Sequence, residues 1–241
     1  MIGVLEVKQE RGRRPLLEER RLMGLRCLWA TVPVAERVSE KRRLRRVKRG
    51  ARSLVQAGVR RVLTAAAFPY WDALNEAGLR GVDPEAFSQA LAVPLTLAAL
   101  VRQDCAPEQA AVLLSGRRVD HAMFRAAETL CPMVRHLSVD AGDEGEELAD
   151  WLRAKFGAAV RPAGGTEANV ALCFGPEIAP ARTVFRLWGP EPDLAGFLPV
   201  LAAGGLPSGL DRLPLLALLW EEGRVSVKQL RILPPNSRQL T

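Results

Sequence analysis

The sequence predicts an α/β protein with a three-layer, Rossmann-like core and a mostly parallel sheet. Short apolar segments rich in β-branched residues alternate with helical segments of ten or more residues, which is the pattern of βαβ crossovers. Of the 241 residues, 48% are hydrophobic, enough for a sizeable core. The mean hydropathy is +0.01, and no apolar run reaches membrane-spanning length. These observations exclude an extended disordered chain and a bundle of membrane helices.

Residues 1–58 are predicted to hold a β-pair and a basic helix. Residues 2–8 and 25–32 alternate in the manner of strands. The polar arm at 9–23 is too long for a tight turn and is interpreted as an extended hairpin or a loop. A helix is expected over about 35–57, with an apolar stripe facing the core. The stripe consists of Leu44, Val47, Ala51, Leu54 and Val55.

Residues 59–190 are predicted to form the Rossmann-like core, in which strands and helices alternate. The expected strands cover residues 59–65, 109–116, 134–140, 169–175 and 183–188. The expected helices cover residues 70–77, 84–101, 120–130 and 144–156. Pro94 should kink or divide the second of these helices. Residues 191–241 are rich in proline and are predicted to add a helix and a last strand, 225–233, that pack on the core.

Residues 110–140 follow the layout of a dinucleotide-binding half, with a strand, a turn, a helix and a strand that ends in an acid. This segment of about 30 residues resembles the general Rossmann-like architecture. It has one glycine where the phosphate-binding fingerprint has three, and Asp120 would repel a phosphate. The candidate ligand-binding residues are Ser115, Gly116, Arg117, Arg118 and Asp140. The alternative interpretation is structural: Gly116 makes a turn, Asp120 caps the helix and Asp140 is a loop acid.

Ligands of open α/β sheets bind outside the carboxyl ends of the strands. In this chain those ends are expected at residues 64–68, 115–116, 140–143 and 174–176. Carboxylates make this edge acidic, which suits a cation or an amine better than a phosphate. They are Asp140, Asp143, Glu144, Glu146 and Glu147.

The sequence contains no recognised catalytic motif. GxSxG, GxxxxGK[ST] and HExxH are absent, so no catalytic residue is assigned and the cofactor stays unknown. No metal site is expected, because the four cysteines are far apart and lack neighbouring histidines at ligand spacing. The cysteines are interpreted as reduced, mostly buried thiols. The charged N-terminus is unlike a secretory signal, so a cytoplasmic location is expected.

The net charge of +7 is concentrated near the N-terminus. Residues 1–61 hold 18 basic and 6 acidic residues, whereas the remainder holds 16 and 21. The basic helix could neutralise several phosphates. Its candidate phosphate contacts are Arg42, Arg43, Arg45, Arg46 and Arg49. A solvated helix face or a surface for an acidic protein are the alternatives, and the lack of Trp or Phe anchors argues against a membrane.

The leading functional hypothesis is a non-catalytic or vestigial Rossmann-like protein that binds a small ligand or a partner. A nucleic-acid-associated protein that uses the basic helix is the alternative. A nucleotide-dependent enzyme with a degenerate glycine turn is the third. The opposite charges of the two parts also favour head-to-tail association with a second copy.

Overall fold

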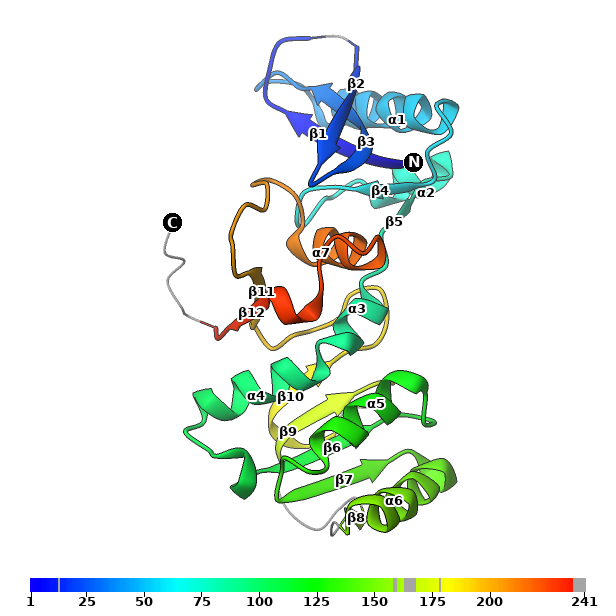
Figure 1. Ribbon diagram of the computed structural model, residues 1–241. Helices are drawn as coiled ribbons and strands as arrows, with labels where there is room; N and C mark the ends of the chain where they lie inside the picture. Colours follow the sequence, from blue (N-terminus) through cyan, green and yellow to red (C-terminus); the bar gives the residue numbers. More distant parts are fainter. Residues whose placement is uncertain (13, 158–159, 163–167, 178, 236–241) are drawn as a thin grey trace. The chain divides into compact units, whose positions relative to one another are not determined.

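The computed structural model describes residues 1–12, 14–157, 160–162, 168–177 and 179–235. It is an α/β protein with one mixed and one parallel five-stranded sheet, and the described residues include seven α-helices (Figure 1). The chain forms two compact units. The first unit consists of Met1–Asp83 and Gly205–Val225, and the second of Pro84–Gly204 and Ser226–Thr241.

These units divide the chain differently from the predicted boundaries after residues 58 and 190. The strand that was expected to open the core, β4 (Arg61–Leu63), is hydrogen-bonded to β1 (Ile2–Lys8) in the first sheet. Residues 59–190 therefore contribute to two sheets. Residues 64–68, expected at the same sheet edge as Asp140, follow β4 in the first unit instead. Hydrophobic pattern identifies strands but not their pairing, since pairing depends on contacts far apart in the chain.

The first sheet has the strand order β2-β3-β1-β4-β5. The expected β-pair is confirmed as two strands, but they run parallel: β1 lies between β3 and β4 and is parallel to both. The polar arm forms an extended hairpin, because β2 runs antiparallel to β3 across the turn at Met23 and Gly24. The remaining bounds are β2 (Leu16–Leu22), β3 (Leu25–Pro33) and β5 (Arg80–Gly81).

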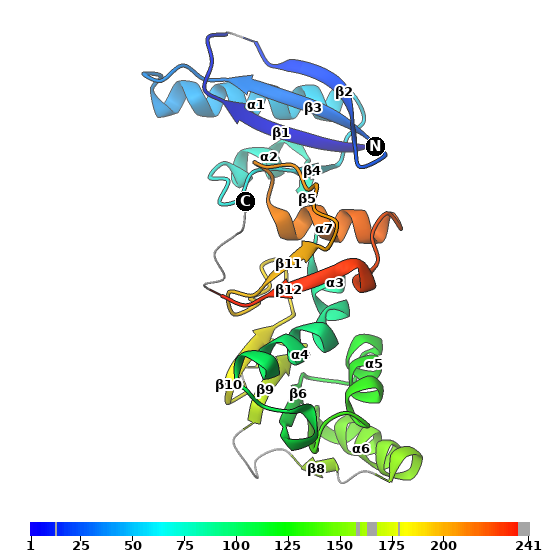
Figure 2. The same ribbon diagram turned by 60° about the vertical axis from the view of Figure 1, so that its left-hand side comes forward.

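Helix α1 (Glu40–Gln56) is the basic helix, and it lies along β1 and β3 (Figure 2). It begins five residues later than predicted, with Ser39 in extended backbone at its N-cap. Its buried residues Val47, Ala51 and Leu54 pack in one core cluster with Leu5 of β1. Leu44, expected in this stripe, is instead 36% exposed. At about 3.6 residues per turn, Leu44 lies at the margin of the buried stripe, on the same side as Val55, which is also only partly buried.

Two further helices complete the first unit: α2 (Trp71–Ala77) and α7 (Arg212–Glu221). Five consecutive residues of α7, from Leu215 to Leu219, are buried, as expected for a helix surrounded by protein. Arg61 of β4 forms a bidentate ion pair with Glu221 of α7, with N–O distances of 2.9 and 2.5 Å. Arg61 lies on the sheet face opposite Leu5, by strand alternation, so α7 and α1 cover opposite faces.

The second sheet is parallel throughout and has the order β10-β9-β6-β7-β8. The chain enters at the central strand β6, moves outward to β8, and returns to the other side of β6 with β9 and β10. The order in which the chain adds strands therefore reverses between β6 and β9: β7 and β8 lie on one side of β6, and β9 and β10 lie on the other. The strands are β6 (Ala111–Ser115), β7 (His136–Asp140), β8 (Val160–Pro162), β9 (Ala168–Cys173) and β10 (Ala181–Arg186).

The helices of the second unit follow the predicted positions. Helix α5 (His121–Leu130) and helix α6 (Gly142–Phe156) link consecutive strands, and Gly157 ends α6 with φ of +64°. The helix expected over 84–101 is divided, as predicted from Pro94, into α3 (Glu85–Ala90) and α4 (Ala92–Arg102). Helix α4 packs on β9 and α5.

An antiparallel ribbon of β11 (Leu198–Leu201) and β12 (Leu230–Leu233) adds to the second unit. Phe197, next to β11, makes an edge-to-face contact with Phe185 of β10. The last strand was expected over 225–233, but residues Val227–Gln229 form a 3-10 turn, so the strand begins at Leu230. Ser226 and Gln229 close that turn as a capping box.

Candidate functional sites

The sequence-predicted ligand residues of the second unit lie together at the carboxyl ends of β6 and β7. Ser115 and Asp140 are register partners, and the Gly116 amide donates to the Asp140 carbonyl oxygen at 2.9 Å. Ser115 is buried, whereas Arg117, Arg118 and Asp140 are exposed. We call this group, Ser115 to Arg118 with Asp140, the β6 edge.

The space at Gly116 is filled by the protein itself. A Cβ built on Gly116 would lie 2.8 Å from the terminal methyl carbon of Met123, in α5. In a dinucleotide site the missing side chain lets the pyrophosphate approach the backbone. Here the absence of a side chain accommodates Met123.

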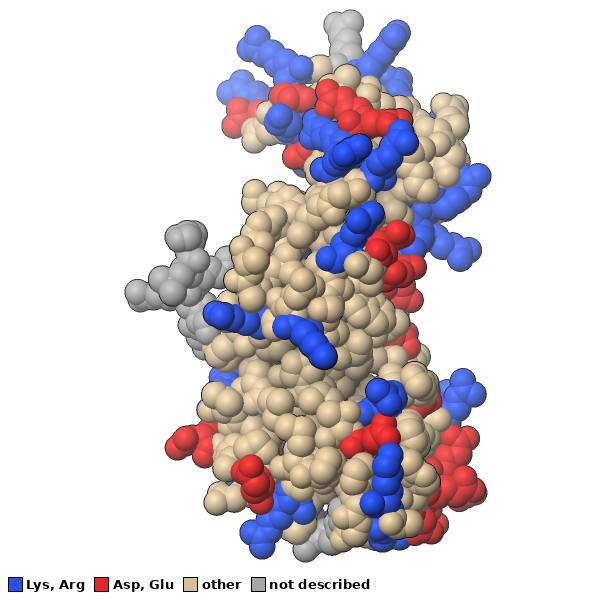
Figure 3. Space-filling model, viewed as in Figure 1, with Lys and Arg blue, Asp and Glu red and all other residues tan. Residues whose placement is uncertain are grey.

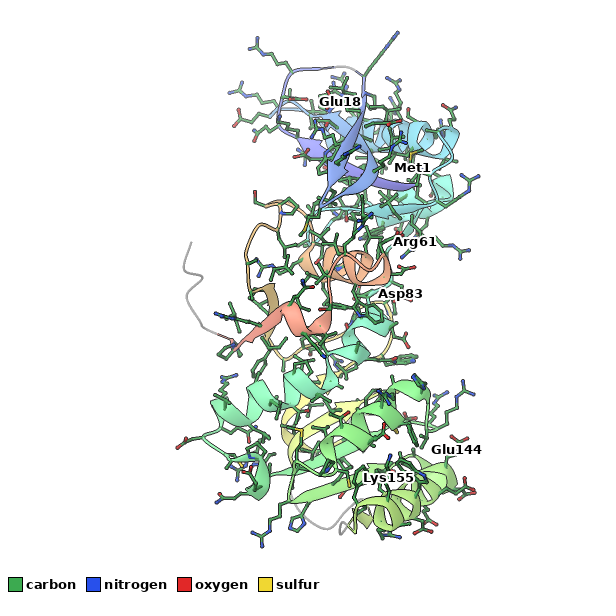
Figure 4. All side chains as sticks on the ribbon, viewed as in Figure 1. Met1, Glu18, Arg61, Asp83, Glu144 and Lys155 are labelled. Atoms are coloured by element: carbon green, nitrogen blue, oxygen red, sulfur yellow. The ribbon has the colours of Figure 1, made fainter. Side chains whose placement is uncertain are left out.

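The amide groups at the start of α5 are bonded to carboxylates. The Val119 amide donates to Oε2 of Glu144 at 2.7 Å, and the Met123 amide donates to Oδ1 of Asp120 at 2.7 Å. Asp120 is therefore the N-cap of α5, as the structural interpretation predicted. Glu144, labelled in Figure 4, reaches this turn from the first turn of α6. Two carboxylates thus accept hydrogen bonds from backbone amides that a phosphate would need as donors.

A third carboxylate pairs with one of the two arginines. Arg117 Nε lies 3.2 Å from Glu177 Oε1. The loop that carries Glu177 also approaches the β6 edge closely at Gly175, where a Cβ would lie 3.3 Å from both the Arg117 nitrogen and the Gly116 Cα. The loops after β6 and β9 are therefore in backbone contact, and only glycine fits at 175 without displacement.

Acidic side chains gather around α6, as Figure 3 shows on its lower right side. The five acids expected at this edge are all exposed: Asp140, Asp143, Glu144, Glu146 and Glu147. Four of them lie within the first six residues of α6, near the helix N-terminus, where the helix dipole favours negative charge.

The five candidate phosphate contacts of α1 are placed differently from one another. Arg42, Arg45 and Arg49 are exposed, and Lys and Arg side chains crowd the surface of the first unit (Figure 3). Arg46 donates to the Pro33 carbonyl oxygen at 2.6 Å. Arg43 is half-buried, 3.6 Å from Glu40.

The first unit also contains a cavity of about 430 Å³ that the sequence did not predict. It opens near the carboxyl ends of β1 and β4, and we call it the β1 cavity. Its lining comes from five separate segments of the chain. The residues are Leu5, Glu6, Val7, Trp29, Arg43, Ala65, Ala66, Ala67, Phe68, Pro69, Tyr70, Ser208, Gly209 and Leu210. The sequence features that point to this cavity are Glu6 and Trp29, a charged and an amphipathic residue inside predicted strands. Nothing in the sequence indicates that they lie near Arg43.

Two kinds of group in the described residues have pKa values shifted mainly by burial. Burial raises the pKa of the Cys27, Cys131 and Cys173 thiols, consistent with the expected buried, reduced cysteines. Cys105 is partly exposed. Burial, together with a hydrogen bond to Glu40, raises the pKa of the Tyr70 hydroxyl, which also contacts Arg43. Tyr70 is therefore a neutral hydroxyl at pH 7.

Within the described part of the chain, no group of three or more His, Cys, Asp or Glu side chains is arranged to hold a metal ion. In the same residues, no helix combines the length and the apolar character needed to cross a membrane.

Comparison with known proteins identifies no family. No protein-family model matches the chain, and no curated protein matches it. One similar solved structure is the L-tryptophan dehydrogenase from Nostoc punctiforme, at 15% sequence identity and a TM-score of 0.29. The match covers 71% of this chain and 55% of that one, so this chain spans little more than half of the dehydrogenase. At this TM-score the likeness supports no argument about function.

Proposed function

We propose that this chain is a non-catalytic, Rossmann-like protein that binds a small ligand at the β6 edge, and that the ligand carries no phosphate. The strand order of the second unit, counted from β6, is 3-2-1-4-5, which matches the first five positions of the 3-2-1-4-5-6 order of doubly wound α/β sheets. In such sheets ligands bind where the order reverses, which here is between β6 and β9.

The observation that carries the proposal is the occupation of the phosphate donors by Glu144 and Asp120. A phosphate would have to displace these carboxylates and would meet the other four acids of this edge, Asp140, Asp143, Glu146 and Glu147. Asp140 still ends the second strand, the position from which an acid accepts a hydrogen bond from a ribose hydroxyl. The edge therefore suits an adenosyl or amine-bearing ligand of neutral or positive charge.

A thermal-shift series tests this proposal. S-adenosylmethionine has a ribose, an amine and a positive charge but no phosphate, and it is expected to raise the Tm, whereas NAD, NADP and ATP are not. Asp140→Asn should abolish the shift, and Asp150→Asn, on the same acidic helix, should leave it unchanged. A shift with NAD that equals or exceeds that of S-adenosylmethionine would contradict the proposal, as would the absence of any shift at millimolar concentration.

The role of Glu144 has its own test. Glu144→Ala frees the Val119 amide, whereas Glu144→Gln keeps an acceptor in the same place. We expect Glu144→Ala to gain measurable affinity for ATP relative to Glu144→Gln. Equal ATP affinity in the two variants would mean that Glu144 does not block a phosphate site.

A second function, association with nucleic acid, is favoured by the exposed arginines Arg42, Arg45 and Arg49. A helix that tracks phosphates releases several counterions, so binding to duplex DNA should weaken with salt at a log–log slope steeper than about −2. A shallower slope would contradict this function. The absence of aromatic residues from α1 places it second, since bases have nothing there on which to stack.

A further inference from the structure

The β1 cavity lies wholly within the first unit and has the size of a small-molecule site. Its volume of about 430 Å³ falls in the range of ligand pockets, roughly 300–1,000 Å³. Its position matches the rule for parallel strands, because the last part of β1 and the residues after β4 form its wall. It is a site separate from the β6 edge, so the proposal below goes beyond the proposed function.

One wall presents a carboxylate that has no cationic partner among the described residues. Glu6 is half-buried on β1, and its Oε2 accepts a hydrogen bond from the Trp29 indole nitrogen at 3.0 Å. Arg20 lies over the Trp29 ring, but it is ion-paired with Glu18. A carboxylate accepts about four hydrogen bonds, and a partly buried charge favours an opposite charge. Glu6 is thus suited to receive an ammonium group.

A second wall presents the partly exposed guanidinium of Arg43. Arg43 of α1 contacts Glu40 and the Tyr70 hydroxyl, while its Nε is buried and has no hydrogen-bond partner in the described structure. The buried Nε offers no surface to a ligand, but 35% of the Arg43 side chain is exposed, so a carboxylate in the cavity meets the exposed part of the guanidinium. A carboxylate is the acceptor that matches a guanidinium best.

The rest of the lining is apolar and held in place. Leu5 is fully buried, and Phe68 is fixed by edge-to-face contacts with Tyr70 and Trp71. The Asp211 amide donates to the Thr64 carbonyl oxygen at 2.8 Å and joins the two connecting loops. Ala67 in this wall has φ of +52°, a conformation that is uncommon for residues other than glycine. The cavity is therefore formed before any ligand binds.

We propose that the β1 cavity binds a small zwitterion with an apolar body, with its ammonium group at Glu6 and its carboxylate at Arg43. A free amino acid with an apolar side chain has this chemistry. The two opposite charges of the cavity favour a ligand with both charges over a ligand with only one.

Calorimetric titration of the full chain with three related probes tests the proposal. L-phenylalanine carries both charges, phenethylamine lacks the carboxylate and 3-phenylpropionate lacks the ammonium group. We expect L-phenylalanine to bind at least tenfold more tightly than either of the others. Failure of all three probes to bind at several millimolar, or equal binding of the three, would overturn the proposal.

Two variants assign the charges. Glu6→Gln should weaken L-phenylalanine about tenfold and leave 3-phenylpropionate unchanged, whereas Arg43→Met should weaken L-phenylalanine and leave phenethylamine unchanged. Glu10→Gln and Arg42→Met remove nearby charges that do not line the cavity and serve as matched controls. L-phenylalanine binding that is insensitive to both Glu6→Gln and Arg43→Met would place the probe elsewhere.

A steric variant tests the proposal without changing either charged residue, so it remains informative if a charge variant misfolds. Ala66 is exposed and lines the cavity, so Ala66→Phe should block L-phenylalanine binding and leave the circular dichroism spectrum unchanged. It should also leave the response to S-adenosylmethionine at the β6 edge intact. Failure of the two proposals can therefore be told apart, because each has its own probe and its own variants.

Discussion

In both units, parallel strands are followed by loops at their carboxyl ends. The space beside these strand ends is filled differently in the two units. In the second unit Met123, Glu144 and Asp120 occupy the turn after β6. In the first unit the ends of β1 and β4 border a cavity whose charged groups lack complete partners. The units also differ in charge: the first has 21 basic and 12 acidic residues, the second 13 and 15. A shared sheet architecture therefore does not fix where a ligand binds, because the side chains of the loops decide whether the strand ends are open.

The largest expected effect comes from truncating one central leucine in each sheet. Leu5 of β1 and Leu114 of β6 are both fully buried. Each change to alanine should lower the free energy of unfolding by about 2–5 kcal/mol. The loss should be smaller for Leu5→Ala, because Leu5 borders an existing cavity that water can enter, whereas Leu114→Ala leaves a closed void.

Urea unfolding of both variants measures this difference. Leu16→Ala, at a position that is 54% exposed, is the control and should change stability by less than about 0.5 kcal/mol. A larger loss for Leu5→Ala than for Leu114→Ala would mean that the wall of the β1 cavity is as tightly packed as the core of the second sheet.

Glycine substitutions at the β6 edge should show how much stability is lost when a new methyl group meets backbone atoms rather than a side chain. In Gly175→Ala the new methyl group meets backbone atoms of Gly116 and Arg117, so we expect a loss of about 1–3 kcal/mol. In Gly116→Ala the one close contact is with the flexible end of Met123 at 2.8 Å, whereas the nearest backbone atom stays at 3.6 Å, so the loss should be smaller. Thermal unfolding compares the two, and the opposite order would show that the loops after β6 and β9 adjust more readily than Met123.

The N-caps of α5 and α7 offer a matched pair between the units. Asp120 accepts from Met123 at 2.7 Å, whereas Asp211 accepts from Leu213 at 3.3 Å. Asp120→Ala should therefore cost about 1 kcal/mol, and Asp211→Ala less. Equal losses in urea unfolding would contradict the difference in bond length.

The smallest expected effect concerns the Arg61–Glu221 ion pair of the first unit. Arg61 is labelled in Figure 4. The hydrogen bond from Arg61 lowers the pKa of Glu221. A depressed carboxyl pKa stabilises the folded chain above the unfolded-state pKa, about 4.3, and this stabilisation is lost as the pH falls through the folded-state value. Because the pair is partly exposed, Glu221→Gln should cost less than about 1 kcal/mol at pH 7.

Measuring the stability of Glu221→Gln against the natural chain from pH 7 to pH 3.5 checks the sign. The difference should shrink as the pH falls. Glu222→Gln, at the next and exposed position, is the control and should show little difference over the same range. A difference that grows with acidity would mean that the pair does not lower the pKa of Glu221.

Much of the local structure followed from the sequence, because it depends on contacts between near neighbours. Asp120 as an N-cap, the break near Pro94 and the glycine end of α6 are local events, and all three are present. The strand ends at Ser115 and Asp140 were also placed correctly, and the two residues do lie beside each other. The start of α1 was placed five residues too early, although a local signal was present, because Ser39 is a residue type preferred at the N-cap.

The sequence by itself determined the α/β class, most of the helices and strands, and the uneven charge. Only the tertiary structure decided that β4 pairs with β1, that two sheets form, and that the turn at Gly116 is closed by Glu144 from another helix. It also decided that Glu6, Trp29, Arg43 and Ser208 border one cavity, although these residues are separated by up to about two hundred positions. Strand pairing and cavity formation depend on long-range packing, and a periodic pattern of apolar residues carries no record of which strands meet.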